Sequence, residues 1–280
     1  MREFKTEKVT KNITRIEGFI GELMYLVEGE ERSALIDTGC GLYSLKKLLE
    51  SLTDKPIIVL LTHGHVDHAM GAGEFENAYM NVNDHDSYVQ HSDIQLRLTS
   101  MESMSEIEEL DEKDFIPSVS LDFFSNLGGG DSFDLGGITI TAYECFGHTM
   151  GSIVFLIEEE RILLLGDACG DFTFMFDEYS LPIDQYKTNL LKLDEELNGK
   201  YDRIINSHGS GEGRLGLIKG VIEVCEDILN GDTDDQIFEF MGKEAHVAKK
   251  IDFDTMSRED GKIGNVVYDK ESIVKEICLK

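Results

Sequence analysis

Four segments of this chain combine histidine and aspartate in patterns that suit metal binding. The first is the run HGHVDH at residues 63–68. The other three are single residues in short glycine- or serine-containing contexts: His148, Asp167 and His208. Imidazole and carboxylate ligands together favour zinc, iron or manganese over calcium or magnesium. The sequence therefore predicts a transition-metal site.

The spacing within residues 63–68 indicates two metal positions. His63 and His65 are two residues apart, so both rings can point to the same side of an extended segment. Asp67 and His68 come after the chain has turned toward a helix, and they can face a second, neighbouring point. One short run can thus supply ligands to two ions.

Each of the four segments directly follows an apolar run that is typical of a buried strand. The unbroken run Ile57–Leu61 precedes the first segment and predicts a strand buried on both faces. Comparable runs end at Phe146, Leu165 and Ile205. A polar group at the rim of a core must be paired or ligated, so we expect these ends to meet.

The elements that would position these side chains follow a repeated order. Two half-molecules, each β-rich and then βα, predict an α+β fold in which two sheets pair face to face with helices outside, a four-layer αββα sandwich. The predicted strands are Asn12–Glu17, Leu23–Glu28, Arg32–Asp37, Ile57–Leu61, Ala78–Val82, Gly137–Phe146, Ser152–Leu165 (a hairpin) and Arg203–Asn206. The predicted helices are Leu42–Leu52, Asp184–Leu197 and Leu215–Leu229, with a helical, polar region after residue 84.

No linker marks a second domain, so we expect one domain over residues 1–280. Residues 84–127 are interpreted as a lid insertion over the cleft or as a solvated surface region, with an acidic stretch at Glu106–Asp114. The C-terminal extension, residues 231–280, either packs on the domain or forms a homodimer contact.

Composition narrows the classes of partner. The chain has 26 Lys and Arg against 55 Asp and Glu, a formal net charge of −29. Such a surface disfavours nucleic acid and anionic membranes, so we expect a small-molecule substrate, no nucleic acid and no membrane. The five cysteines form no CxxC pair, the start is too charged for a signal peptide, and no run approaches a membrane span. We therefore expect a cytoplasmic protein.

Taken together, the motifs resemble those of the metallo-β-lactamase superfamily, from about residue 12 to residue 208. They stand in this chain as LIDTG at 35–39, THGHVDH at 62–68, GHTMGS at 147–152, LGD at 165–167 and SHG at 207–209. The resemblance implies the metallo-β-lactamase fold and a complete set of ligands for two divalent ions. The first ion would be held by His63, His65 and His148, and the second by Asp67, His68 and His208, with Asp167 bridging both. It also implies that Asp37 supports the ligand loop.

Differences within the superfamily restrict the function. The β-lactamases themselves generally lack an aspartate at the position of Asp167, and flavo-diiron reductases carry Glu at the position of His65. Members that process nucleic acid use basic surfaces, which the charge of this chain opposes. The remaining resemblance is to glyoxalase II and the lactonases. A glyoxalase II usually has basic residues after the last histidine that bind glutathione. Here the only tight basic pair in that region is Lys249-Lys250, so the sequence does not support glutathione as part of the substrate.

The expected function is a metal-dependent hydrolase with zinc, or alternatively iron or manganese, at both positions. A hydroxide bridging the two metal ions would cleave a small-molecule ester, thioester, lactone or phosphodiester, with Asp67 or Asp167 orienting it or accepting the proton. The alternative is an oxidoreductase resembling the persulfide dioxygenases, which bind one iron with fewer ligands.

Several other residues are given provisional roles. The aromatic stretch Phe172–Tyr179 is predicted as a loop that either lines a pocket beside the metals or fills the core. Tyr179 or Tyr186 is a candidate hydrogen-bond donor to substrate. Three histidines without a strand end before them are interpreted as surface or capping residues: His85, His91 and His246. Cys145 and Cys169 are interpreted as small buried side chains.

Overall fold

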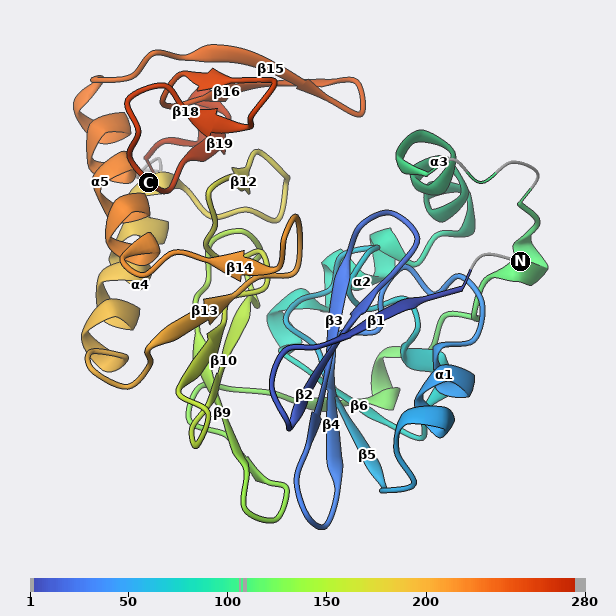
Figure 1. Ribbon diagram of the computed structural model, residues 1–280. Coiled ribbons are helices and arrows are strands. Elements are labelled where there is room, and N and C mark those ends of the chain that lie inside the picture. The colour runs from blue at the N-terminus through green and yellow to red at the C-terminus, as the bar shows by residue number, and fades with distance from the viewer. Residues whose placement is uncertain (1–2, 106, 108–109, 275–280) are drawn as a thin grey trace, which may run out of the picture.

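Two β-sheets packed face to face form the centre of the computed structural model, which describes residues 3–105, 107 and 110–274 (Figure 1). The first sheet has the order β1 (Lys5–Lys8), β2 (Ile13–Glu17), β3 (Leu23–Glu28), β4 (Ser33–Ile36), β5 (Ile57–Leu60), β6 (Ala78–Met80), β7 (Phe124–Asn126). The second has the order β14 (Glu212–Gly213), β13 (Arg203–Ile205), β11 (Ile162–Leu164), β10 (Ile153–Ile157), β9 (Thr139–Glu144), β8 (Ser132–Asp134).

The apolar strands of the second sheet contribute side chains to two cores, one on each face of the sheet. In β10, Ile153, Phe155 and Ile157 join the core between the two sheets. The intervening Val154 and Leu156 pack against the helices on the other face. Successive side chains of a strand point to opposite faces, so only a continuous apolar run can fill both layers.

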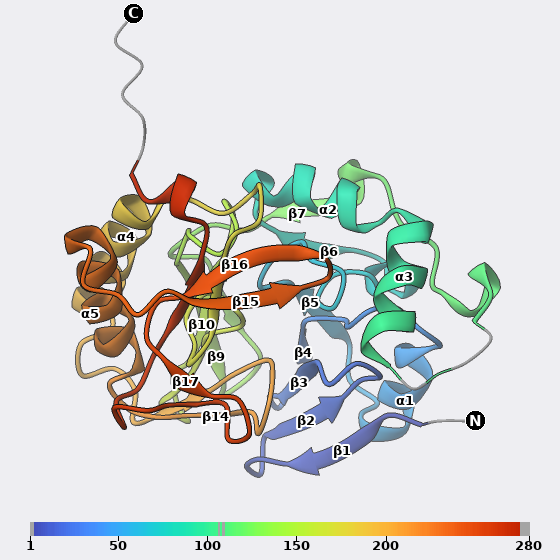
Figure 2. The same ribbon diagram turned by 90° about the horizontal axis from the view of Figure 1, so that it is seen from above.

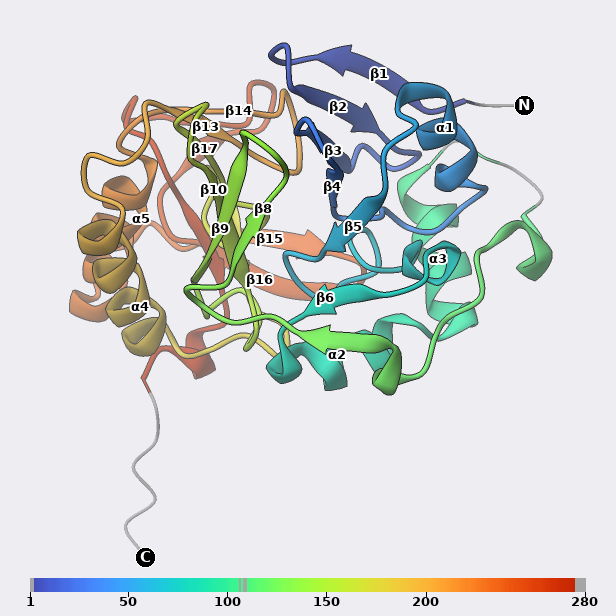
Figure 3. The same ribbon diagram turned by 90° about the horizontal axis from the view of Figure 1, so that it is seen from below.

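Helices cover the outer face of each sheet (Figure 1 and Figure 3). The first sheet is covered by α1 (Leu45–Leu52), α2 (His85–His91) and α3 (Ile94–Met104), and the second by α4 (Ile183–Glu196) and α5 (Leu217–Asn230). Asp93 caps α3 by accepting hydrogen bonds from the amides of Gln95 and Leu96. The predicted four-layer αββα sandwich is confirmed.

Short 3-10 turns complete these elements, at Ala72–Glu74, Val82–Asp84, Glu112–Asp114, Leu121–Phe123 and Lys270–Ser272. Residues 84–127 contain α2, α3 and β7, and they contribute the buried Tyr88, Arg97 and Phe124. The acidic stretch Glu106–Asp114 lies partly outside the described residues. A lid role for this region stays a prediction.

Three strands of the C-terminal extension join β12 (Thr173–Met175) of the second half-molecule in a further sheet. Its order is β12, β19 (Val266–Tyr268), β16 (Lys243–Val247), β15 (Gln236–Phe240), and a small ladder joins β17 (Ile251–Asp252) to β18 (Ser257–Arg258). Figure 2 shows the β15–β16 hairpin reaching from the second half toward the first. Ala248, Val266 and Tyr268 of the extension pack in one core with residues of α4 and α5. A homodimer contact stays a prediction, and Cys278 lies outside the described residues. Within the described part of the chain, no helix is long and apolar enough to cross a membrane.

Candidate metal centre

Strand ends from both sheets meet at one edge of the sandwich. In the first sheet β4 and β5 are parallel neighbours, and in the second β11 and β13 are. Their carboxyl ends therefore lie at the same edge of each sheet. Residues 63–68 follow β5, Asp167 follows β11 and His208 follows β13, while His148 follows β9.

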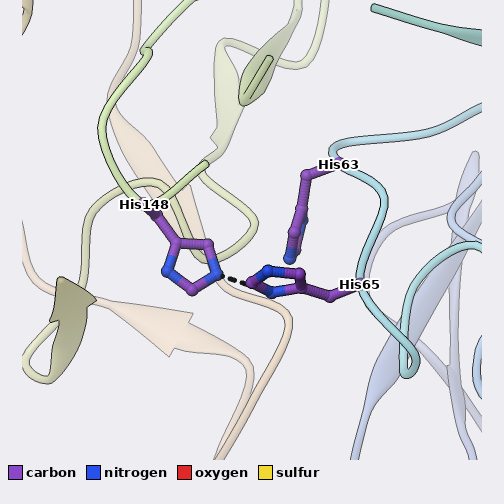
Figure 4. A group of neighbouring side chains, drawn as sticks. All are labelled: His63, His65 and His148. Atoms are coloured by element: carbon purple, nitrogen blue, oxygen red, sulfur yellow. Dashed lines mark hydrogen bonds between the residues drawn. The ribbon is translucent and has the colours of Figure 1, made fainter. Parts of the chain in front are cut away.

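His63, His65 and His148 form a first cluster (Figure 4). Three of their ring nitrogens, one from each residue, lie within 4.8 Å of one another, and His65 Nδ1 is 3.1 Å from His148 Nε2. Two nitrogens that share one ion at the usual bond length lie about 3.3 Å apart. His148 Nδ1 donates to the carbonyl oxygen of Phe174 at 2.7 Å, which leaves Nε2 free to face the cluster. Among the described residues, buried His63 Nε2 has no hydrogen-bond partner.

Asp67, His68, Asp167 and His208 form a second cluster. The Nε2 atom of His208 lies 3.3 Å from Asp67 Oδ2 and 3.2 Å from Asp167 Oδ2. The same Asp167 oxygen lies 3.5 Å from His68 Nε2 and 4.0 Å from His148 Nε2. Asp167 thus presents one oxygen to both clusters.

Two histidines of the first cluster, His63 and His65, have a pKa lowered well below the ordinary value, which favours the neutral ring. Burial, followed by the neighbouring His68, lowers the pKa of His63 well below its ordinary value. Burial and then His148 lower the pKa of His65 in the same way. A neutral imidazole is the form that ligates metal ions, so these rings are ready for coordination.

The buried carboxylates of the second cluster, Asp67 and Asp167, are stabilised in their charged form by neighbouring positive charge. Burial acts to raise the pKa of Asp167, but the charges of His208 and His68 outweigh it and hold the pKa well below its usual range. Conversely, burial opposes the charge on His208, but Asp167 and Asp67 raise its pKa to about 10. A divalent cation can replace the histidine protons as the source of that charge. The unpaired nitrogens and the donor set therefore fit two metal ions.

Asp37 holds the segment of residues 62–68 through hydrogen bonds. Its Oδ2 accepts a hydrogen bond from His68 Nδ1 at 2.8 Å, and its Oδ1 accepts one from the amide of Thr62 at 2.8 Å. The hydroxyl of Thr62 also contacts this carboxylate and lies 3.0 Å from His63 Nδ1. Asp37 has a φ of 60°, a rare conformation outside glycine that turns the chain sharply after β4.

Asp84 is a supporting residue that the sequence analysis missed. Its buried carboxylate accepts hydrogen bonds from the Gly64 amide at 2.8 Å, the Thr149 hydroxyl at 2.9 Å and the Gly151 amide at 2.6 Å. Gly64 lies between His63 and His65 of the first cluster, and Thr149 follows His148. One carboxylate therefore joins the loops that carry His63, His65 and His148.

Two of the interpretations from sequence are wrong. His91 is not a surface residue, because its ring stacks on His65 at 4.4 Å and its Nδ1 accepts a hydrogen bond from the Val66 amide at 3.1 Å. Tyr186 cannot donate to substrate, because it is fully buried and its hydroxyl donates to the Ala168 carbonyl at 2.7 Å. His91 at the end of α2 reaches the site only through tertiary packing, which no local motif reveals.

The remaining histidines, His85 and His246, lie outside both clusters, and the two cysteines named from the sequence are buried. His85 has a buried Nε2 without a partner among the described residues, and His246 lies half-buried on β16. Among the described residues, neither joins a group of side chains that could hold a metal ion. Cys145 and Cys169 are buried, as expected.

The aromatic stretch 172–179 belongs to the site and to a core at the same time. Thr173–Met175 is the strand β12 rather than a loop, and its Phe174 carbonyl fixes His148. The half-buried rings of Phe174 and Phe176 pack on Phe238 and Phe240 of β15, with Phe174–Phe240 ring centres 5.3 Å apart. Tyr179 is half-exposed, and its role as a donor stays a prediction.

Comparison with known proteins agrees with these arrangements. The family model described as "Metallo-beta-lactamase superfamily" matches residues 18–208. The human acyl-coenzyme A thioesterase MBLAC2 is 25% identical over 172 residues, which cover 53% of this chain and 58% of that protein. The hydroxyacylglutathione hydrolase GloC of Haemophilus influenzae is 27% identical over 192 residues, covering 65% of this chain and 82% of that one. This chain therefore spans less than two thirds of the length of the thioesterase.

Solved structures share the fold. The metallo-beta-lactamase FIM-1 from Pseudomonas aeruginosa, in a mono-zinc form, has a TM-score of 0.58 at 18% identity. The match covers 81% of this chain and 96% of that one. The Sulfolobus tokodaii protein ST1585, described as an archaeal superfamily member, has a TM-score of 0.53 at 18% identity, covering 84% and 92%.

Proposed function

The chain belongs to the metallo-beta-lactamase superfamily, and on that premise we propose that it is a binuclear metallo-hydrolase acting on a small molecule. The observation that carries the proposal is the position of Asp167, whose Oδ2 lies within 4.0 Å of His148, His68 and His208. A carboxylate oxygen between two histidine clusters suits a ligand common to two ions.

In this proposal His63, His65 and His148 hold one ion, Asp67, His68 and His208 hold the other, and Asp167 contacts both. Zinc is the first choice, with iron or manganese as alternatives. Two bound ions would lower the pKa of a shared water toward neutrality and polarise the oxygen of the scissile group.

The residues of the chain supply orientation and proton transfer. His208 is 41% exposed, so the second cluster opens to solvent and a substrate can reach it. Asp67 and Asp167 are low-pKa carboxylates at this opening, and each has a second oxygen that can accept a hydrogen bond from the attacking water. Asp37 and the Phe174 carbonyl fix the ring orientations of His68 and His148.

The surroundings favour an acyl substrate without much negative charge. A hollow beside Asp177 is lined by Phe176 together with Glu178, Glu244 and Asp269. These carboxylates and the net charge of −29 disfavour a negatively charged phosphodiester as the reacting group. The named activities of MBLAC2 and GloC concern acyl-coenzyme A and hydroxyacylglutathione. We therefore place an ester, thioester or lactone with an apolar acyl group ahead of a phosphodiester.

Metal content tests the proposal directly. Elemental mass spectrometry of protein purified without added metal or chelator should find about two zinc, iron or manganese ions per chain. Asp167→Ala should lose hydrolysis of a panel of esters, thioesters and lactones. The matched control is Asp202→Ala, because Asp202 pairs with Arg161 at the opposite end of β13 from His208.

The metal content and the activity of Asp167→Ala distinguish a binuclear hydrolase from a mononuclear oxidoreductase. A single iron per chain that stays single after metal supplementation, with retained turnover in Asp167→Ala, would contradict a binuclear hydrolase. That result would support the mononuclear oxidoreductase instead.

A further inference from the structure

The two ring nitrogens of His65 lie in different environments. Nδ1 is 3.1 Å from His148 Nε2, so it is the nitrogen that faces the first cluster. Nε2 is buried and has no hydrogen-bond partner among residues 3–105, 107 and 110–274. If Nδ1 binds an ion, Nε2 carries the proton of the ring and becomes a buried donor that needs an acceptor.

His91 and Asp177 lie next to the ring of His65. Together with His65 they form a third group whose nitrogen and carboxylate oxygen atoms, one from each residue, lie within 4.8 Å of one another. The Nδ1 atom of His91 already accepts a hydrogen bond from the Val66 amide, so its other nitrogen also carries a proton. Asp177 is therefore the acceptor in a group with two N–H donors.

The carboxylate of Asp177 is itself held in place. Its Oδ1 accepts a hydrogen bond from the amide of Tyr179 at 3.2 Å. Its Oδ2 lies 3.9 Å from Nζ of Lys243, the first residue of β16. Lys243 follows the turn of the β15–β16 hairpin, which lies outside the residues that match the family model. The carboxylate thus stands between the hairpin and the two histidines.

We propose that Asp177 is a positioning residue for the first metal position, accepting a hydrogen bond from His65 Nε2 directly or through one water. The spacing of the group is longer than a hydrogen bond, and a bridging water or a small rotation of the carboxylate closes it. This contact fixes which nitrogen of His65 faces the ion, and Lys243 holds the carboxylate in position. The proposal rests on the proposed function for the assignment of His65 as a ligand.

Metal affinity is the first test, with a readout independent of turnover. Zinc and cobalt(II) binding is measured by competition with a chromophoric chelator for wild type, Asp177→Ala, Asp177→Asn and Lys243→Met. The expected result is a loss of about 10- to 100-fold in affinity at one of the two sites for Asp177→Ala, with smaller losses for the other two variants. Glu178→Gln is the control, because this neighbouring carboxylate pairs with Gln90 instead.

The second test observes the nitrogen itself. In zinc-loaded protein labelled with ¹⁵N-histidine, the Nε2 proton of His65 should exchange slowly in wild type and rapidly in Asp177→Ala. If Asp177 only stabilised the fold, the exchange rate of the His65 Nε2 proton would be the same in wild type and in Asp177→Ala. Thermal unfolding in the presence of chelator checks that each variant folds, and Asp177→Asn keeps the shape of the side chain if the alanine variant is unstable.

The outcomes distinguish the two proposals. Wild type that binds two ions while Asp177→Ala binds them with unchanged affinity and an unchanged His65 signal would overturn the positioning role alone. Wild type that binds no divalent ion would overturn both the positioning role and the proposed function.

Discussion

The carboxylate of Asp37 accepts a hydrogen bond from His68 Nδ1 at 2.8 Å, and both side chains are 1% exposed. Because Nδ1 is the donor, Nε2 is the nitrogen turned toward Asp67 and Asp167. The pairing also orients the chain, since the same carboxylate accepts a hydrogen bond from the amide of Thr62, the residue directly before His63. A residue at the end of β4 therefore determines the geometry at the end of β5.

Asp37→Asn should weaken the binding of one of the two ions. The amide keeps the shape of the side chain, but it loses the charge that holds His68 in this tautomer and orientation. We expect about 10- to 100-fold lower affinity at the second cluster, measured by chelator competition. Asp54→Asn, at an exposed carboxylate before β5, should bind both ions as wild type does. Unchanged stoichiometry and affinity in Asp37→Asn would contradict the supporting role.

Asp84→Asn should destabilise the fold as well as the metal centre. The Asp84 carboxylate accepts three hydrogen bonds from two loops, and the amide can no longer accept all of them. A buried donor left unpaired costs about 1–3 kcal/mol, so we expect a loss of that size in the free energy of unfolding. Urea denaturation in the presence of chelator measures it without the contribution of bound ions. Asp86→Asn, at an exposed carboxylate on α2, is the control and should unfold at the wild-type midpoint.

Tyr186→Phe should lower stability while leaving metal binding intact. The Tyr186 hydroxyl donates to the carbonyl of Ala168, next to Asp167, in the core between β11 and α4. Losing this buried hydrogen bond should cost about 1 kcal/mol in the free energy of unfolding. Tyr179→Phe should instead leave stability unchanged and raise KM if Tyr179 donates to substrate. A large rise in KM for Tyr186→Phe would mean that its hydroxyl reaches the substrate after all.

The carboxylate of Asp235 should make one part of the stability acid-sensitive. Burial opposes its charge, but contacts with Lys270 and Tyr268 lower its pKa from 3.8 to about 2. A depressed pKa stabilises the fold above the unfolded value, and that contribution is lost as the pH falls from about 4 toward 2. The group is near the surface, so solvent screening limits the effect to less than about 1 kcal/mol.

The difference in urea midpoint between wild type and Asp235→Asn measures this contribution. It should be present in full at pH 6 and mostly lost at pH 2. Asp254→Asn, at an exposed carboxylate, should show no difference at either pH. A difference that persists in full at pH 2 would assign the effect to packing rather than charge.

Strands buried on both faces were predictable, because each of their residues is apolar and the sequence shows an unbroken apolar run. The prediction Leu23–Glu28 has the same bounds as β3. By contrast, β12 was predicted as part of a loop, since its pairing partner β19 lies about ninety residues further along the chain. Local periodicity does not encode such a pairing. The strand β15 was also missed, because the apolar Ile237 on its exposed face interrupts the alternation of apolar and polar residues that predicts a strand.

The candidate ligands were predictable from motifs, whereas their supporting residues were not. Residues 63–68 carry the chemistry in one run, so the pattern predicts it. Asp84 and Asp177 act from the ends of other elements and belong to no motif. Their roles depend on which backbone amides and ring nitrogens the tertiary fold brings to them. Sequence reasoning therefore identifies the ligands of such a site more readily than the groups that orient them.

Phe240→Ala should change which acyl groups the enzyme prefers. Phe238 and Phe240 lie on one face of β15 and pack on Phe174, whose carbonyl holds His148, so this aromatic face adjoins the proposed catalytic centre. Removing the ring should raise KM several-fold for esters with long apolar acyl chains and leave acetyl esters unaffected, because only the longer chain reaches the missing surface. Ile237→Ala, on the exposed face of the same strand, is the control. An equal rise in KM for short and long chains would show that the aromatic face supports the fold without contacting the acyl group.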